Sequence, residues 1–312
     1  MVDYLVSVHP TASGTGAFSY STLDAAVDNA VTDTTATTGD TVAIEIQGDW
    51  SATDDTARVT LTGAQGSCDQ LTIQCDADNY FRGVYESDRY RLFVAGECMV
   101  GSDDNVHVYG LYMQSSSSSG TTGAYESNVT GQTLLDGCGF RADNGAGITC
   151  LGGGTVVLAR NCYAHDSVEG FLAINGTAVL HNCVARNNSG RGFRRQGGTV
   201  TAQNCLADAN AGDDFLGTLG GDYNASSDAT APGANSITSA TFSFESASSG
   251  VLDASDTSGA IGGGIDLSAD ASLPVVLDIF GEAYLDPPSM GINEAGVASN
   301  IIYNTIIFGA NF

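Results

Sequence analysis

One phrase occurs three times in this chain at almost equal spacing. "NCYAHDSVEGF" begins at Asn161, "NCVARNNSGRGF" at Asn182 and "NCLADANAGDDF" at Asn204, so the copies are 21 and 22 residues apart. A fainter copy, "GCGFRADNGAGI", precedes them and has Cys138 in the place of their cysteine. A repeat of this length is typical of a solenoid, in which each unit packs only against its neighbours. The repeat therefore predicts an elongated stack of coils.

The residues that precede each asparagine indicate which kind of solenoid this is. The positions two before the asparagine are apolar, namely Ala159, Leu180 and Ala202. The positions immediately before it are polar, namely Arg160, His181 and Gln203. This alternation with period two indicates a strand that is buried on one face. A leucine-rich repeat would need leucine in a common column, which the array lacks. The pattern therefore predicts an all-β fold, a parallel β-helix.

Residues of one kind recur at the same place in each coil, and coils stack about 4.8 Å apart. We expect the asparagine amides to point inward and to bond one another from coil to coil. Cysteine suits a narrow interior as a free thiol, and phenylalanines can stack on one another. Zinc would need paired Cys or His at short spacing, and no Cys-x-x-Cys occurs, so no metal site is predicted. The predicted structural ladder comprises Asn161, Asn182, Asn204, Cys138, Cys162, Cys183, Cys205, Phe171, Phe193 and Phe215.

The rest of the chain can be divided around these repeats. The segment "YSTLDAAVDNAV" predicts a short amphipathic helix, which would cap the open N-terminal end of the solenoid. Its predicted buried face comprises Leu23, Ala26, Val27, Ala30 and Val31. The predicted divisions are an N-terminal segment with the helix cap (1–65), β-helix coils (66–216, clearest in 137–216), C-terminal coils and cap (217–299), and an apolar tail (300–312).

The chain is strongly acidic. It has 36 acidic and 10 basic residues, all of the basic ones arginine, and its formal net charge is -26. Such a surface repels nucleic acid and anionic membranes, so neither is an expected partner. Carboxylate oxygens suit Ca2+, but no motif places a site, and no cofactor is predicted.

The first residues and the number of cysteines indicate in which cellular compartment the chain is made. The start, "MVDYLVSVHPTASG", lacks the apolar core of a signal peptide, and no run approaches the ~18 apolar residues of a membrane span. We therefore expect synthesis in a cytoplasm. The eight cysteines are then expected to be thiols.

Three stretches resemble a known superfamily. "YSTLDAAV" with "GDTVAIEIQG", the coil "GGTVTAQNCLADANAGDDF" and the ending "DIFGEAYLDPPSMGINEAG" resemble the right-handed parallel β-helix, pectin-lyase-like superfamily. The likeness covers roughly residues 20–296 and is strongest to phage and environmental β-helix proteins. It implies a right-handed parallel β-helix with a short N-terminal capping helix. Members include lyases, hydrolases, tailspikes and inert scaffolds, so the fold alone assigns no activity.

Catalytic patterns of such enzymes are found only as fragments. "GDD" at Gly212 to Asp214 matches one part of a polygalacturonase-like site, in which carboxylates and a His act as acid and base. The accompanying Asn-x-Asp, Gly-His-Gly and Arg-x-Lys parts are absent from the sequence. The arginine cluster "GRGFRRQ" at 190–196 lacks the proline of the pectate lyase motif. We therefore predict no catalytic residue and no enzyme activity.

The function that we predict from these features is a non-enzymatic virion structural protein. Its expected place is a capsid decoration or head appendage of a tailed phage or virus, assembled in the host cytoplasm and extracellular after release. Its expected partners are virion or capsid proteins or its own subunits, with a host-surface glycan as a further candidate. One alternative is a tail spike or fibre that binds or degrades host polysaccharide. Another is a secreted bacterial β-helix adhesin or polysaccharide lyase.

The tail "NIIYNTIIFGANF" at 300–312 is apolar and carries no charged side chain. Exposed on so acidic a surface, it would be a liability, so we expect it to be covered. Either it folds back to cover the C-terminal end of the solenoid, or it pairs with a neighbouring subunit or capsid protein by strand addition, and the position of the tail at a chain end favours the partner. The predicted contact residues are Ile301, Ile302, Tyr303, Ile306, Ile307, Phe308 and Phe312.

Overall fold

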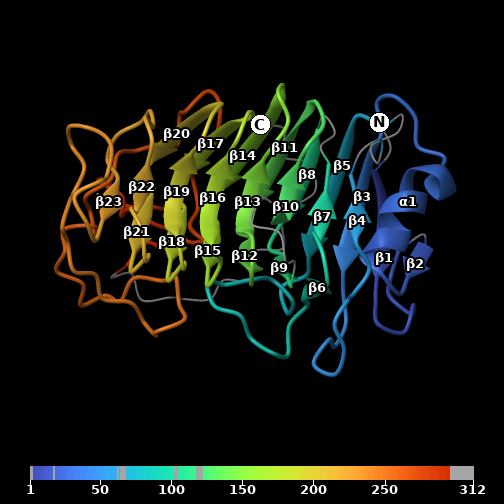
Figure 1. Ribbon diagram of the computed structural model, residues 1–312. Helices are drawn as coiled ribbons and strands as arrows, with labels where there is room; N and C mark the ends of the chain where they lie inside the picture. The colour runs from blue at the N-terminus through green and yellow to red at the C-terminus, as the bar shows by residue number, and fades with distance from the viewer. Residues whose placement is uncertain are drawn as a thin grey trace.

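The computed structural model describes residues 3–16, 18–61, 63, 68–101, 105–116 and 122–295. Short strands wind repeatedly around one long axis and line up into three sheets along the molecule (Figure 1). We call the nine-stranded sheet A and the two seven-stranded sheets B and C. The prediction of an all-β parallel solenoid is confirmed by this topology.

Each sheet runs along the molecule, with its strands in the following spatial order. Sheet A contains β2 (Phe18–Tyr20), β1 (Asp3–Val8), β3 (Thr41–Ile46), β5 (Gln70–Cys75), β8 (Val106–Tyr109), β11 (Gly131–Asp136), β14 (Thr155–Arg160), β17 (Thr177–His181) and β20 (Thr199–Gln203). Sheet B contains β23 (Ala225–Ser226), β21 (Leu206–Asp208), β18 (Val184–Arg186), β15 (Tyr163–His165), β12 (Gly139–Ala142), β9 (Tyr112–Ser115) and β6 (Leu92–Val94). Sheet C contains β22 (Phe215–Leu216), β19 (Arg191–Arg195), β16 (Glu169–Ala173), β13 (Ala146–Cys150), β10 (Gly123–Ser127), β7 (Met99–Val100) and β4 (Val59–Thr60).

Each coil takes one strand from each sheet, and the repeated phrase covers the same part of each coil. The clearest coils are β14–β15–β16, β17–β18–β19 and β20–β21–β22. The parallel register pairs Val157 with Ala178 and Ala178 with Val200, so residues of like kind stack along the axis. The period of 21 to 22 residues is therefore the length of one turn of the solenoid.

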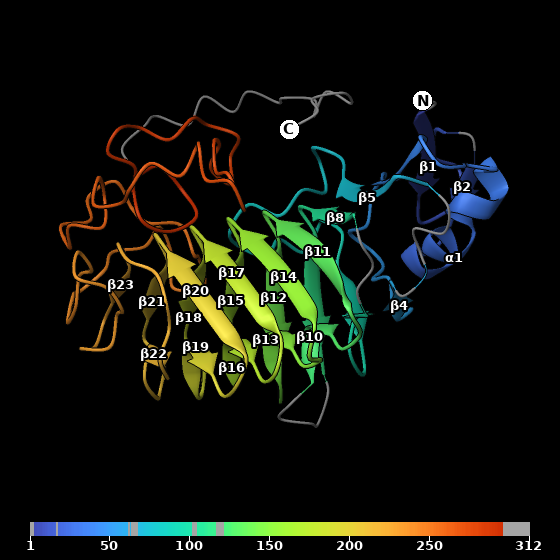
Figure 2. The same cartoon turned by 90° about the horizontal axis from the view of Figure 1, so that it is seen from above.

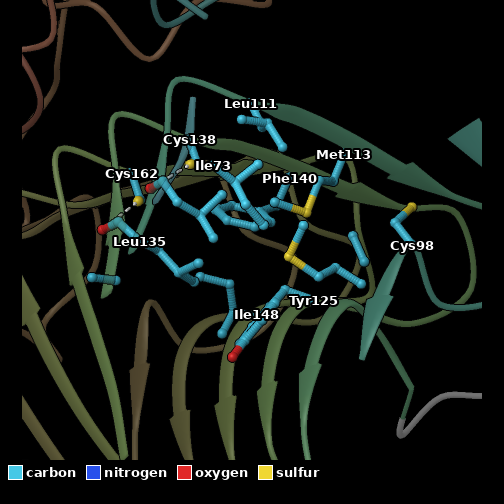
Figure 3. Close-up of a cluster of buried hydrophobic side chains, with 14 of the residues drawn as sticks. Ile73, Cys98, Leu111, Met113, Tyr125, Leu135, Cys138, Phe140, Ile148 and Cys162 are labelled. Carbon is cyan, nitrogen blue, oxygen red and sulfur yellow. Dashed lines mark hydrogen bonds between the residues drawn. The ribbon is translucent and has the colours of Figure 1, made fainter. Parts of the chain in front are cut away.

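The interior of the solenoid is one continuous apolar core. Side chains from all three sheets meet there, among them Leu135, Phe140 and Ile148, each at most 1% exposed (Figure 3). Burial of this apolar surface is the main favourable contribution to folding.

The helix α1 (Leu23–Thr34) lies at the N-terminal end of the solenoid, as predicted (Figure 1). Its buried residues are Leu23, Ala26, Val27 and Ala30, with Val31 partly buried against the core. The helix packs on β1, β2, β3 and β4. The N-cap is Thr22, whose Oγ1 accepts a hydrogen bond from the Ala25 N–H at 3.3 Å. No helix in the described part of the chain has the length and apolar character that crossing a membrane requires.

The predicted C-terminal coils do not form in the described residues beyond β23. Residues 237–295, which we call the C-terminal segment, instead fold back along the outside of the solenoid (Figure 2). They cover the outer face of sheet B, where Tyr163, Val184 and Leu206 form a second apolar core with residues of the segment. The contributions of the segment to this core include Val251, Leu252, Ile279, Met290 and Ile292. Within the predicted C-terminal region 217–299, β23 and the parallel bridge of Ile237 to Ala225 extend sheet B. The described residues that follow Ile237 bury their apolar side chains against an outer face instead of forming coils.

Candidate functional site

Each repeated asparagine occupies the corner between a strand of sheet A and a strand of sheet B. Asn161, Asn182 and Asn204 follow β14, β17 and β20, and their φ angles are 53°, 51° and 53°. Asparagine is one of the few residues other than glycine that adopt this left-handed conformation at low cost. The sharp corner explains why asparagine recurs at this place.

The asparagine side chains point away from the coil interior, so the prediction that they point inward is wrong. Asn161 Nδ2 donates to the Leu277 carbonyl at 2.9 Å. Asn204 Nδ2 donates to the Ile265 carbonyl at 2.8 Å, and Asn204 Oδ1 accepts from the Ile265 N–H at 2.9 Å. One bond of the expected kind joins two coils, from Asn204 Nδ2 to Asn182 Oδ1 at 3.4 Å. The asparagines thus bind mainly the C-terminal segment.

The flanking residues give the reason for this orientation. Ala159 and Cys162 both lie in the interior core, with Arg160 and Asn161 between them. Strict alternation over an extended strand cannot place Ala159, Asn161 and Cys162 all inward, because they do not share one parity. The left-handed corner at Asn161 breaks the alternation and turns the amide outward.

Other side chains at the same edge also hold the C-terminal segment. His181 Nδ1 lies 2.8 Å from the Leu273 carbonyl and donates to it, while Arg160 donates to the Pro274 carbonyl. Burial lowers the pKa of His181. Side chains along this edge of the coils therefore donate hydrogen bonds to main-chain carbonyls of the C-terminal segment, which has little regular secondary structure to bond them.

The repeated cysteines lie in the interior, and all eight cysteines of the chain are buried thiols that form no disulfide. Cys162 Sγ is 3.6 Å from the Leu135 carbonyl of the preceding coil (Figure 3), and Cys183 Sγ is 3.4 Å from the Ala159 carbonyl. Burial raises the pKa of Cys98 and Cys150 to about 12, and that of Cys162 and Cys183 well above the ordinary range. These thiols are packing residues with weak hydrogen bonds.

Thiol titration is expected to show this directly. The folded protein should react very slowly with a thiol reagent, because all eight sulfur atoms are buried and the reagent cannot reach them. In denaturant without reductant, all eight cysteines should react. The matched control is the reduced and denatured protein, which must give the same titre. A titre lower by two in the unreduced sample would mean that a disulfide is present.

The repeated phenylalanines stack along one side of the core. The ring centroids of Phe171 and Phe193 are 4.8 Å apart with planes 8° from parallel, and those of Phe193 and Phe215 are 4.8 Å apart with planes at 11°. Ile148 pairs in register with Phe171 and continues the column. Such stacked rings stabilise the register of one coil on the next.

Many of the charged side chains that could act as an acid or a base form ion pairs between neighbouring coils. Arg160 Nε donates to Asp136 at 2.8 Å, and Arg186 Nε donates to Asp208 at 2.9 Å. Glu169 is buried, and its Oε1 accepts from Arg191 at 3.1 Å and from Arg194 at 2.9 Å. These ion pairs join residues of neighbouring coils. The arginine cluster singled out in the sequence therefore neutralises a buried carboxylate.

The "GDD" fragment does not form a pair of catalytic carboxylates. Asp213 is exposed, whereas Asp214 is buried and accepts hydrogen bonds from Asn210 Nδ2 and from the Ser227 N–H, each at 2.7 Å. Burial raises the pKa of Asp214, although these hydrogen bonds oppose the effect. Asp214 closes a turn of the last coil, which is a structural role.

Sequence reasoning missed one arrangement that resembles an acid–base relay. The Tyr112 hydroxyl lies 3.2 Å from His165 Nε2, and His165 Nδ1 lies 2.9 Å from Asp166 Oδ2. The hydrogen bond from His165 lowers the pKa of Asp166, and burial raises that of Tyr112. Tyr112 is only 3% exposed because Phe81 and Tyr85 stack on it. Its hydroxyl is therefore closed to a large substrate.

A hollow of about 200 Å³ opens beside the asparagine corner. Asn182 and Asn204 line it from the coils, and the C-terminal segment supplies the other walls. The Tyr284 hydroxyl, next to this hollow, lies 3.1 Å from both Asn161 Oδ1 and the Gly291 carbonyl, and burial raises its pKa. The other lining residues are Ile265, Asp266, Leu267, Ser268, Val275, Val276, Ala283, Leu285, Asp286 and Pro288.

Two predictions from the sequence have no direct counterpart in the structure. In the described ranges, no group of three or more His, Cys, Asp or Glu side chains is arranged to hold a metal ion. That no cofactor is needed stays a prediction. The tail residues Ile301 to Phe312 lie outside the described residues, so their contact role also stays a prediction.

Comparison with known proteins gives a likeness of fold only. No protein-family model matches the chain, and no curated protein sequence matches it. Among solved structures, it is similar to pectate lyase Pel9A, with 13% sequence identity, a TM-score of 0.42, and coverage of 96% of this chain and 90% of that chain. No residue role is transferred from that enzyme at this identity.

Proposed function

We propose that the protein is a non-enzymatic structural solenoid, and that it serves on the outside of a virion as a capsid decoration or head appendage. The observation that supports a structural, non-enzymatic role is that several charged side chains form ion pairs between coils. Asp136, Asp208 and Glu169 are each paired with arginine between coils, and Asp214 closes a turn. Groups engaged in this way hold neighbouring coils together, which supports a structural role for them.

Three further properties support a place on the outside of a particle. Buried thiols with raised pKa values remain protonated and unreactive after release into an oxidising medium. A net charge of -26 repels packaged nucleic acid, which favours the outer surface over the inner one. The stacked coils also form an elongated body that suits an appendage.

The alternative is a β-helix that degrades host polysaccharide, as a tailspike or a secreted lyase. The chain of hydrogen bonds from Tyr112 through His165 to Asp166 favours it, because a lyase needs a base and an acid in one place. The burial of Tyr112 opposes it. His165→Ala would abolish an activity that depends on this relay, whereas Asp213→Ala, at an exposed carboxylate, is the matched control.

Two measurements test the proposal. Mass spectrometry of purified particles from the producing host is expected to find this chain as a stoichiometric component. The purified protein is expected to release neither reducing ends nor unsaturated uronates from a panel of acidic and neutral polysaccharides. Cleavage that is lost in His165→Ala and kept in Asp213→Ala would replace the proposal by the alternative, and particles without this chain would contradict the virion assignment.

A further inference from the structure

The exposed apolar surface of the described chain is concentrated at one place. Five large apolar side chains are exposed, and four of them lie in the C-terminal segment. These four, Ile265, Val276, Leu277 and Leu285, are 37–56% exposed, and we call them the apolar patch. Ile265, Val276 and Leu285 line the hollow beside the asparagine corner. Exposed apolar side chains around a hollow mark a contact site.

The hollow has the size of one aromatic side chain. Its volume is about 200 Å³, and a cavity of about 150 Å³ is enough to hold a benzene ring. Asp266 and Asp286 also line it. Two carboxylates at an apolar hollow repel an acidic occupant, whereas an uncharged apolar segment meets no such repulsion.

The described chain ends beside this patch. The Glu294 carboxylate accepts hydrogen bonds from the Ser289 N–H at 2.9 Å and from the Leu285 N–H at 3.4 Å. Ala295, the last described residue, is 6% exposed in the second apolar core. Residues 296–300 join Ala295 to Ile301, so the first apolar residue of the tail lies within about 22 Å of Ala295.

We propose that residues 301–312 bind the apolar patch of their own chain, with one aromatic ring of the tail in the hollow. The tail contains seven large apolar residues and no charged side chain, so its side chains can approach this acidic surface without repulsion. The short connection gives it a millimolar effective concentration at the patch, which no second molecule matches at ordinary protein concentrations. The tail thus folds back on its own chain, but onto the C-terminal segment and not over the C-terminal end of the solenoid as the sequence suggested.

Chymotryptic cleavage at Tyr303 and Phe308, followed by mass spectrometry of the intact chain, tests this proposal. Val276→Asp combined with Leu285→Asp places charge on two exposed positions of the patch without touching either core. Cleavage of the tail is expected to be about tenfold faster in this double variant than in the wild type, because proteolysis follows the population of undocked tail. The control is Phe18→Asp, which adds charge at the exposed apolar residue remote from the patch and should leave the rate unchanged.

Two outcomes would overturn the proposal. Equal cleavage rates in the wild type and the double variant would mean that the patch does not hold the tail. Protection that falls on dilution, together with a dimer in sedimentation that the double variant loses, would mean that the tail binds a second copy. Protection that is independent of concentration and lost in the double variant supports the intramolecular site. Circular dichroism of each variant checks that the solenoid remains folded.

Discussion

Replacement of Phe193 by alanine is expected to lower the free energy of unfolding by about 3–5 kcal/mol. Phe193 is fully buried, and its ring lies between those of Phe171 and Phe215, with centroids 4.8 Å away on both sides. The substitution removes the transfer energy of the ring and leaves a cavity that the rigid coils cannot close. It also removes two stacked contacts, each worth about 0.5–1.5 kcal/mol beyond the buried area.

Urea unfolding followed by circular dichroism measures this effect, with Phe18→Ala as the matched control. Phe18 is 40% exposed on β2, so its loss should cost no more than about 0.5 kcal/mol. Phe193→Leu keeps most of the volume and should cost less than Phe193→Ala, because the cavity is smaller. Equal stability of Phe193→Ala and Phe18→Ala would show that the column does not hold the coils together.

The coils could be predicted because a solenoid repeats its local rules. The alternation before each asparagine places Val157, Ala159 and their equivalents inward, and the fold confirms the parallel register that this implies. The capping helix follows from the spacing of Leu23, Ala26 and Ala30, all of which are buried. In each case the information lies within one turn of the chain, and the next turn repeats it.

The direction of the asparagines could not be obtained by the same rule. Alternation holds for extended residues, and it fails where the backbone enters the left-handed region, as at Asn161 and Asn182. The inward position of Cys162, one residue later, was a sign that the alternation breaks at this corner.

The covering of sheet B also had a signal in the sequence. The residue after each repeated cysteine is apolar, namely Tyr163, Val184 and Leu206, although it points outward. Strands that are apolar on both faces need a second layer, and the C-terminal segment supplies it. Which residues of the C-terminal segment contact Tyr163, Val184 and Leu206 could not be predicted, because the segment has no period of its own.

The contact of Tyr112 with His165 could not be predicted for a similar reason, because the two residues are 53 positions apart and no repeat relates them.

The corner asparagines should be the points at which the C-terminal segment is attached, and Asn204 should be the most sensitive of them. Its amide both donates to and accepts from the main chain of Ile265, and the residue is 1% exposed. Asn204→Leu should cost about 1–3 kcal/mol for the polar groups left without partners. The free energy of unfolding should fall by about 1–2 kcal/mol more, because leucine is strained in the left-handed conformation at a φ of 53°.

The release of the C-terminal segment, and not the loss of stability, distinguishes the two orientations of the asparagines. If Asn204 pointed inward and bonded only the amides of neighbouring coils, Asn204→Leu would also lower the free energy of unfolding, but it would leave the C-terminal segment protected. With the amide outward, Asn204→Leu should lower the unfolding free energy and expose residues 253–270 to limited proteolysis. Asn204→Gly separates the two causes, because glycine keeps the left-handed corner and loses only the hydrogen bonds. Asn204→Gly should expose the C-terminal segment to the same protease, with a smaller loss of unfolding free energy than Asn204→Leu. If the segment stays protected in both variants, Asn204 does not hold it.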